Sequence, residues 1–460
     1  MNQIKRLKPN TEQRTLPASG WLTTAFHAAV VTLFWFNIQG VIGQVPVIKE
    51  PQPSSFNQVL IGSNQNSNIT NVPNNSSNDP LYQYKQDQKE LQKRNETLNK
   101  VLNKQTLNRQ IQYDLPSLAN QPGAEHYRNA ATKLNSMLRG AEPMSLKRAV
   151  FMTENAYLGG RLKYDDFNKQ IQKLVFIAKL KAGQSGYDWN NPQTRNIMLF
   201  RVLADTLEVK DASSEGGTAT SYPMQYDFDD IMGTNNWTKM FVSKLLKTKT
   251  GQCHSLPLLY LILCEETNTQ ANLAFSPSHS YAKFKDKSGN WYNVELTNGR
   301  IVSDAFITAS GYITSEALKN HLYMEPQTKR QTIANCLNDL AIGYSQKYGY
   351  DGFISQCADT TLKYTPANIS ARQMKANYQT HRFEYVVNQV GRPHPDVLKS
   401  QYPKVYRLLE ERDKTYRFID ESGFQAMPIE AYQAWLKSLN EEKAKQENQG
   451  LMLRLTKTLN

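Results

Sequence analysis

Cys253, His279 and Glu295 have the side chains, and stand in the order, that thiol-dependent acyl transfer requires. Apolar residues at helical spacing predict a helix from Cys253 to Glu266, with the cysteine in its first turn. The positive end of a helix lowers the pKa of a thiol there and favours the thiolate. Gly251 permits a tight turn that exposes the sulfur, and the backbone N–H groups of this turn can face a developing oxyanion. The sequence therefore predicts Cys253 as a nucleophile.

A β-hairpin is predicted to bring His279 beside Glu295. Apolar runs at 279–285 and 291–297 flank the sequence Asp-Lys-Ser-Gly-Asn, which is typical of a hairpin turn. Paired positions across this turn sum to about 574–576, so His279 is expected opposite Glu295 or Thr297, and side-chain alternation puts them on one face. A carboxylate there can accept the second ring N–H of the histidine, which fixes the tautomer and stabilises the imidazolium.

The segments that carry these residues resemble the transglutaminase-like superfamily over about Tyr222 to Arg300. They are Thr-Gly-Gln-Cys253-His-Ser-Leu-Pro, Ser-His279-Ser-Tyr-Ala-Lys-Phe and Trp291-Tyr-Asn-Val-Glu295-Leu-Thr297. The resemblance implies an α+β, papain-like core with a small antiparallel sheet and a Cys-His-Glu triad. That family usually has aspartate as the third member, a role that glutamate can fill. Its bacterial members are thought to be mostly thiol peptidases, amidases or acyltransferases.

Several other residues are candidates for a role beside this triad. Trp237 stands where some members of the family place an oxyanion-stabilising indole, although a core tryptophan fits the position as well. Gln252, next to the nucleophile, is a second candidate for oxyanion support. Asp304 is an alternative orienting carboxylate, and His254 is predicted to point to a different side of the helix from Cys253. Ordinary polar or packed roles are expected for the remaining candidates, His321 and His381.

The cysteines give no sign of a metal or disulfide framework. The chain has four, Cys253, Cys264, Cys336 and Cys357, with no CxxC pair, and it lacks a loop with calcium-ligand spacing. We therefore expect no metal and no cofactor. Cys336 and Cys357 fall on two predicted helices whose pattern, ending at Pro366, is similar to about one tetratricopeptide repeat. Either a disulfide between them or two buried thiols fits this placement.

The N-terminus predicts an exported protein. An apolar stretch at 21–42 ends near the small-residue sequence Val-Ile-Gly43 and follows four basic residues, Lys5, Arg6, Lys8 and Arg14. This pattern fits a cleaved secretory signal, and the stretch is also long enough for an uncleaved signal anchor; a buried core helix is the third alternative. The charge bias places the rest of the chain outside the cytoplasm. A periplasmic or membrane-anchored location is expected.

Composition divides the chain into five parts. The expected parts are a signal peptide or anchor at 1–43, a disordered linker and polar helical stalk at 44–124, a transglutaminase-like domain with a helical N-terminal part at 125–315, a helical repeat-like domain at 316–440 and a charged tail at 441–460. Within the third part, the polar and glycine-rich residues 211–221 predict a surface loop. The resemblance implies that the fold class is α+β.

Two functions follow from these observations. The first is an extracytoplasmic thiol-dependent hydrolase or acyltransferase that acts on amide bonds of a peptide or protein. The alternative is a non-catalytic scaffold that binds a protein partner through its C-terminal helices. Lys and Arg number 54 against 41 Asp and Glu, for a net charge of +13, but this excess is spread along the chain. It favours anionic surroundings such as a phospholipid face over nucleic-acid binding.

Overall fold

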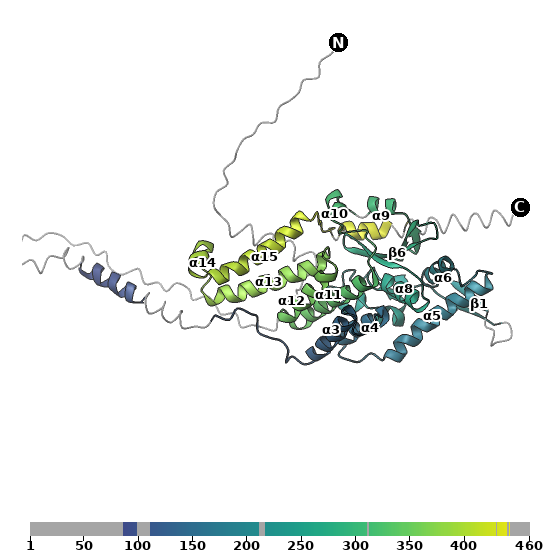
Figure 1. The fold of residues 1–460 in the computed structure, drawn as a ribbon, viewed down its shortest axis with the longest axis horizontal. Coiled ribbons are helices and arrows are strands. Elements are labelled where there is room, and N and C mark those ends of the chain that lie inside the picture. The colour runs from purple at the N-terminus through teal and green to yellow at the C-terminus, as the bar shows by residue number, and fades with distance from the viewer. Residues whose placement is uncertain are drawn as a thin grey trace, which may run out of the picture. The chain divides into compact units, whose positions relative to one another are not determined.

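The computed structural model mixes helices with small sheets (Figure 1). It describes residues 86–98, 111–210, 217–310, 312–428, 430–438 and 441. The predicted signal segment and most of the linker and charged tail lie outside these ranges. Within them, no helix is both long enough and apolar enough to cross a membrane.

Contacts divide the described residues into two units. The first contains residues 115–383 and the described residues from 407 onward, and the second contains residues 86–98, 111–114 and 384–406. In the second unit, residues 86–98 form an exposed helix, and the Gln389 amide bonds both the N–H and the C=O of Gln112. The predicted domain boundary at 315 falls inside the first unit.

Four helices open the first unit: α3 (Ala124–Leu138), α4 (Leu146–Tyr157), α5 (Tyr164–Gln184) and α6 (Pro192–Ala204). The predicted N-cap of α4 is present, since the Ser145 side chain accepts the N–H of Arg148. The predicted apolar stripe of α5 is buried at Phe167, Ile171 and Leu174. Periodicity alone located both helices because each buries one face against the same core.

In the described ranges the strands form three small sheets. They are β1 (Leu207–Lys210), β2 (Thr218–Ser221), β3 (Gln225–Tyr226), β4 (Thr250–Gly251), β5 (Asn272–Ser276), β6 (His279–Lys285), β7 (Trp291–Glu295) and β8 (Arg300–Val302). β1 pairs antiparallel with β2, β3 pairs parallel with β4, and β5 to β8 form an antiparallel sheet in chain order. The prediction of a loop at 211–221 is thus wrong for residues 218–221. These polar residues form a strand because they pair with β1.

A buried helix, α8 (Ser255–Glu266), lies at the centre of the first unit. Every residue from Ser255 to Cys264 is buried, since the helix contacts β5 and β6 as well as α4, α5, α6 and α7 (Val242–Thr248). The apolar sequence Leu-Pro-Leu-Leu-Tyr-Leu-Ile-Leu suits a helix with no solvent face. The end of α8 that carries the site is therefore fixed by packing on all sides.

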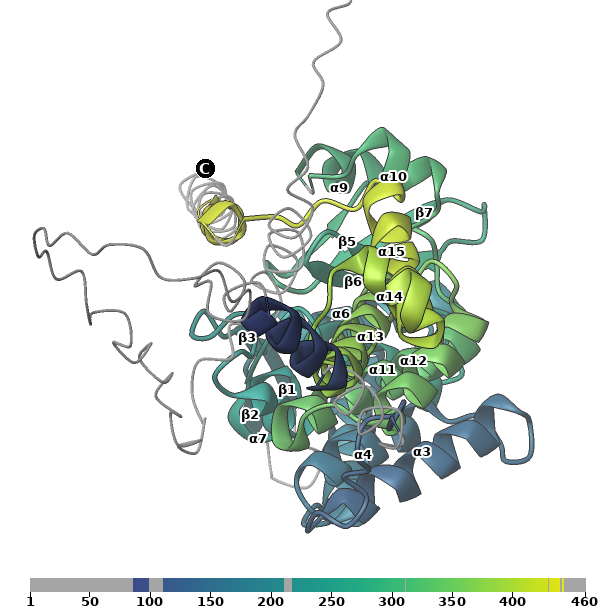
Figure 2. The same cartoon turned by 90° about the vertical axis from the view of Figure 1, so that its left-hand side faces the viewer.

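The C-terminal part is helical, as the sequence predicts. Its elements are α9 (Asp304–Ser310), α10 (Ser315–Lys319), α11 (Lys329–Tyr348), α12 (Gly352–Tyr364), α13 (Ile369–Gln389), α14 (Pro395–Gln401), α15 (Pro403–Glu421) and a helix at 430–438. α11 begins with a capping box between Thr328 and Gln331. It packs against α12 and also against α3 and α4 (Figure 2), so it joins both ends of the first unit into one core.

Candidate active site

Cys253 lies in the turn that joins β4 to α8. The helix begins at Ser255, two residues later than predicted, so the cysteine precedes its first turn and still faces the N-terminal end. Ser255 fixes the turn, because its Oγ accepts the N–H of Gln252 at 3.0 Å. Gly251 is required there, since a Cβ at this position would lie 2.6 Å from that Oγ.

The structure brings His279 and Glu295 together in the sheet. Nε2 of His279 lies 2.6 Å from Oε2 of Glu295, and the other carboxylate oxygen accepts the N–H of Thr297 at 2.9 Å. Only 1% of either side chain in the pair is exposed. The β6–β7 ladder pairs Ala282 with Val294, and continuing this register sets His279 opposite Thr297. Glu295 therefore reaches the imidazole along the diagonal of the ladder.

The second ring nitrogen of His279 is left for the thiol. Nδ1 is buried and makes no hydrogen bond within the described ranges, while Cys253 and the imidazole are close enough to shift the pKa of each other. This is a near approach, such as catalytic groups commonly show before a substrate aligns them. The hydroxyl of Ser280 donates to the carbonyl of Cys253 at 2.6 Å and so ties the nucleophile turn to β6.

Electrostatics in this site favour a thiolate–imidazolium pair. Burial alone would raise the pKa of Cys253, but the nearby His279 imidazolium outweighs burial and the pKa is lowered. Burial would lower the pKa of His279, and the Glu295 carboxylate instead raises it to about 10. Burial would likewise raise the pKa of Glu295, but the positive imidazolium outweighs burial and the pKa is lowered. Each group thus stabilises the charged form of its neighbour.

Neither predicted support residue is hydrogen-bonded to the triad among the described residues. Gln252 is fully buried, and its Nε2 donates to the carbonyls of Asp229 and Asp230, at 3.2 Å each. Trp237 begins the short helix η1 (Trp237–Met240) and is 7% exposed. Its indole N–H edge lies near Gly343 of α11, where an added Cβ would be 3.6 Å from Nε1.

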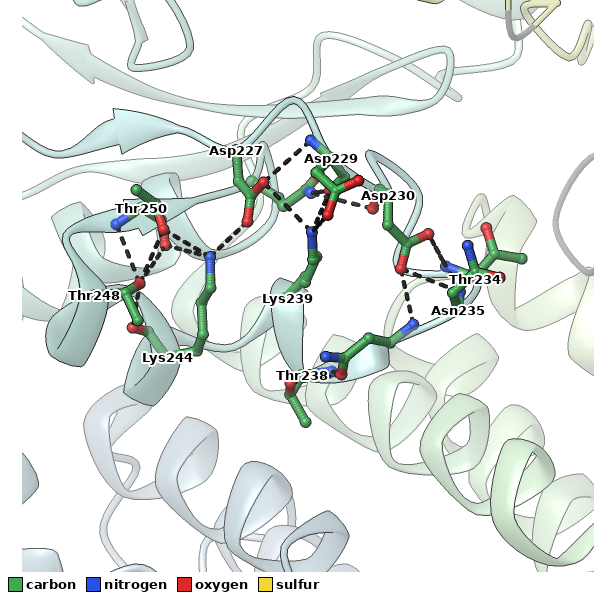
Figure 3. A network of polar contacts seen from close by, with 12 residues as sticks. Asp227, Asp229, Asp230, Thr234, Asn235, Thr238, Lys239, Lys244, Thr248 and Thr250 are labelled. Atoms are coloured by element: carbon green, nitrogen blue, oxygen red, sulfur yellow. Dashed lines mark hydrogen bonds and ion pairs between the residues drawn. The ribbon is translucent and has the colours of Figure 1, made fainter.

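The loop that holds Gln252 is braced by polar contacts (Figure 3). Asp227 accepts from Lys244 at 2.7 Å and forms an ion pair with Lys239. The carboxylate of Asp230 receives backbone N–H groups from residues 234–236. Gln252 therefore anchors the nucleophile turn to a rigid loop.

Three aromatic residues complete the site, and the sequence analysis did not single them out. The hydroxyl of Tyr432 donates to Sγ of Cys253 at 3.3 Å, and the hydroxyl of Tyr226 lies 3.3 Å from that of Tyr432. The ring of Trp435 meets the imidazole of His279 edge-on, with 4.7 Å between centroids. The one available signal was the Tyr-x-x-Trp spacing, which puts two aromatic residues on one helix face.

A cavity of about 170 Å³ opens beside the thiol and the imidazole. Its lining mixes apolar side chains with carboxamides, including Phe275, Leu258, Asn335, Asn338, Asn368 and Gln373. Cys253 and His279 therefore border a cavity whose other polar groups include carboxamides and the His254–Asp339 pair.

His254 is bound away from the thiol. Its Nε2 lies 3.1 Å from Oδ2 of Asp339 on α11, and its Nδ1 lies 3.1 Å from the carbonyl of Met240. Burial would lower its pKa, but the charge of Asp339 raises the pKa of His254 to about 9. Both ring nitrogens are thus engaged, Nε2 by α11 and Nδ1 by η1.

The remaining candidates have structural contacts. Asp304 accepts from Lys283 at 3.0 Å and from Asn293 at 2.8 Å. His321 is exposed and pairs with Glu325, while the ring of His381 stacks on that of Tyr350 at 4.3 Å.

All four cysteines are buried, free thiols. Burial raises the pKa of Cys264, Cys336 and Cys357, and the pKa of Cys253 alone among them is lowered. No group of three or more His, Cys, Asp or Glu within the described ranges could hold a metal ion. The four thiols therefore differ sharply in expected reactivity.

No protein-family model and no curated protein matches the chain. Among solved structures it is similar to menin, from a crystal structure that reveals the binding site for the Mixed Lineage Leukemia (MLL) protein. That alignment covers 68% of this chain and 76% of that chain at 11% sequence identity, with a TM-score of 0.29. A likeness this loose carries no argument about fold or function.

Proposed function

We propose that this protein is a thiol-dependent hydrolase or acyltransferase that acts on amide bonds of a peptide or protein. The observation that supports it most is the buried 2.6 Å contact between His279 and Glu295 beside Cys253. This arrangement supplies a nucleophile, a proton carrier and an orienting carboxylate in one site. A transglutaminase-like, papain-type core belongs to the same proposal.

In this mechanism the Cys253 thiolate attacks the amide carbonyl. The sulfur–carbon bond forms as the carbonyl π electrons move to oxygen, and the His279 imidazolium then gives its proton to the leaving nitrogen as the carbon–nitrogen bond breaks. Water or a second amine then attacks the thioester while His279 takes its proton, and the carbonyl re-forms as the carbon–sulfur bond breaks, which returns the Cys253 thiolate and the imidazolium. Glu295 stays ionised and holds the imidazole.

The proposal includes the setting of the reaction. Export through the N-terminal segment would place the site outside the cytoplasm, in the periplasm or at the membrane, as the charge pattern before 21–42 suggests. Segment 21–42 would also supply any membrane association. The C-terminal helices are the part available to a protein partner.

Thiol labelling tests the activity. Iodoacetamide should modify Cys253 first, with a rate that reaches half its maximum well below pH ~8.5, the pKa of an ordinary thiol. Peptide mass spectrometry of the full chain, sampled over time between pH 5 and 10, measures each of the four cysteines separately. Slow labelling at equal rates would instead favour the non-catalytic scaffold, an alternative that the 8% exposure of Cys253 keeps open.

A further inference from the structure

The catalytic thiol has a second neighbour besides the imidazole. Tyr432 is fully buried, and its hydroxyl donates to Sγ of Cys253 at 3.3 Å. Because its hydrogen is used there, the contact of 3.3 Å between the two tyrosine hydroxyls runs from Tyr226 to Tyr432. The three groups form a chain of hydrogen bonds, Tyr226 to Tyr432 to Cys253, that ends on the sulfur.

The chain comes from elements distant in sequence. Tyr226 stands in β3, whose pairing with β4 sets it beside Gly251 at the nucleophile turn. Tyr432 belongs to the helix at 430–438, which also places Trp435 against the ring of His279. One helix therefore contacts both the sulfur and the imidazole.

The position of Tyr432 argues against a simple cover over the thiol. Cys253 and His279 line the cavity, and the residues that line it include neither Tyr432 nor Trp435. A substrate group in the cavity can thus approach the sulfur while the tyrosine keeps its contact. A buried anion needs such donors, since desolvation without them is costly.

We propose that Tyr432 is a fourth catalytic residue: its hydroxyl holds the Cys253 thiolate by a hydrogen bond, and Tyr226 is the positioning residue that fixes the direction of that hydroxyl. This inference rests on the proposed function, because only a thiolate in use needs such a donor. Burial, and then the negative sulfur, raise the pKa of Tyr432 well above its ordinary value, so the hydroxyl stays a donor.

The test is the pH profile of Cys253 alkylation by iodoacetamide in the full chain. Tyr432→Phe should move the midpoint upward by about one pH unit, a tenfold change in the thiol equilibrium, because a donor to a charged acceptor is lost. The plateau at high pH should rise no more than about threefold, as the more basic thiolate is the better nucleophile. Tyr226→Phe should shift the midpoint in the same direction by less.

Tyr281→Phe is the matched control. Its ring stacks 6.4 Å from that of His279, and its buried hydroxyl has no partner in the described part of the chain. The same loss of a hydroxyl beside the same histidine should leave the midpoint in place. Thermal unfolding of all three variants checks that each is folded.

Two results would overturn the inference. An unchanged midpoint in folded Tyr432→Phe would show that the hydroxyl does not hold the thiolate. A plateau raised tenfold or more at an unchanged midpoint would make Tyr432 a cover that limits access. Failure of the proposed function looks different, because wild-type Cys253 would then label as slowly as the other three cysteines.

Discussion

Two histidines, each paired with a carboxylate, line the same cavity as Cys253, and they differ in what their second ring nitrogen does. In both pairs the carboxylate raises the pKa of the histidine, His279 beside Glu295 and His254 beside Asp339. The other ring nitrogen of His254 contacts a backbone carbonyl. Nδ1 of His279, in contrast, has no hydrogen bond among the described residues, and the imidazole lowers the pKa of the neighbouring Cys253 thiol. The raised pKa alone would not separate the two. The uncommitted nitrogen does, and we assign catalysis to one pair and structure to the other.

The largest expected effect is on the thiol. His279→Ala should slow iodoacetamide labelling of Cys253 at pH 7 by about a hundredfold, the lower range for losing a general base, because the thiol loses the charge that favours its ionised form. His254→Ala, in the same assay, should stay within about threefold of wild type. Equal losses in the two variants would erase the distinction between the pairs.

The His254–Asp339 pair should be visible in stability. His254→Ala removes a tie between α8 and α11, so the free energy of unfolding in urea should fall by about 2 kcal/mol, roughly thirtyfold in the equilibrium. The side chain of His254 is 30% exposed, and solvent screening keeps the loss below that of a fully buried pair. A loss under about 0.5 kcal/mol would contradict a structural role.

A matched pair of carboxylate variants sharpens the comparison. Glu295→Gln keeps an acceptor for His279 but removes the negative charge, so labelling of Cys253 at pH 7 should slow by about tenfold. Asp339→Asn makes the same chemical change at the other histidine and should leave the labelling rate within twofold. The two labelling rates, measured by mass spectrometry, test whether the carboxylate beside His279 affects the reactivity of Cys253 and the carboxylate beside His254 does not.

The smallest effect concerns pH. A histidine whose folded pKa is raised stabilises the fold fully below its unfolded pKa of ~6.5, and this contribution is lost as pH rises through the folded value. For His254, with a pKa of about 9, the loss falls between about pH 6.5 and 9. Between these two pH values the free energy of unfolding of the wild type should therefore fall by about 1 kcal/mol more than that of His254→Gln. Parallel curves for the two proteins would rule out this linkage.

The elements that the sequence predicts correctly are those that depend on local contacts. The hairpin at 279–295 and the start of the helix near Cys253 follow from turn residues and apolar spacing within about twenty positions. The start of α8 lies two residues later than predicted, because residues 252–254 form a turn that the contact between the N–H of Gln252 and Oγ of Ser255 holds. The polar strand at 218–221 escaped prediction because only its partner β1 makes it a strand.

The sequence by itself determined the turn at Cys253, the hairpin and the order of the three side chains of the proposed triad, because each depends on neighbours a few residues away. Only the tertiary structure decided which histidine has a ring nitrogen free of hydrogen bonds among the described residues. It also decided that Tyr432 contacts the thiol and Trp435 contacts the imidazole. Those choices depend on Asp339 from α11 and on the helix at 430–438, which lie 86 and 179 residues beyond the cysteine, as positions 339 and 432 against 253 show. Side-chain periodicity carries no information at such a range, since packing of the whole core sets which helix meets the sulfur.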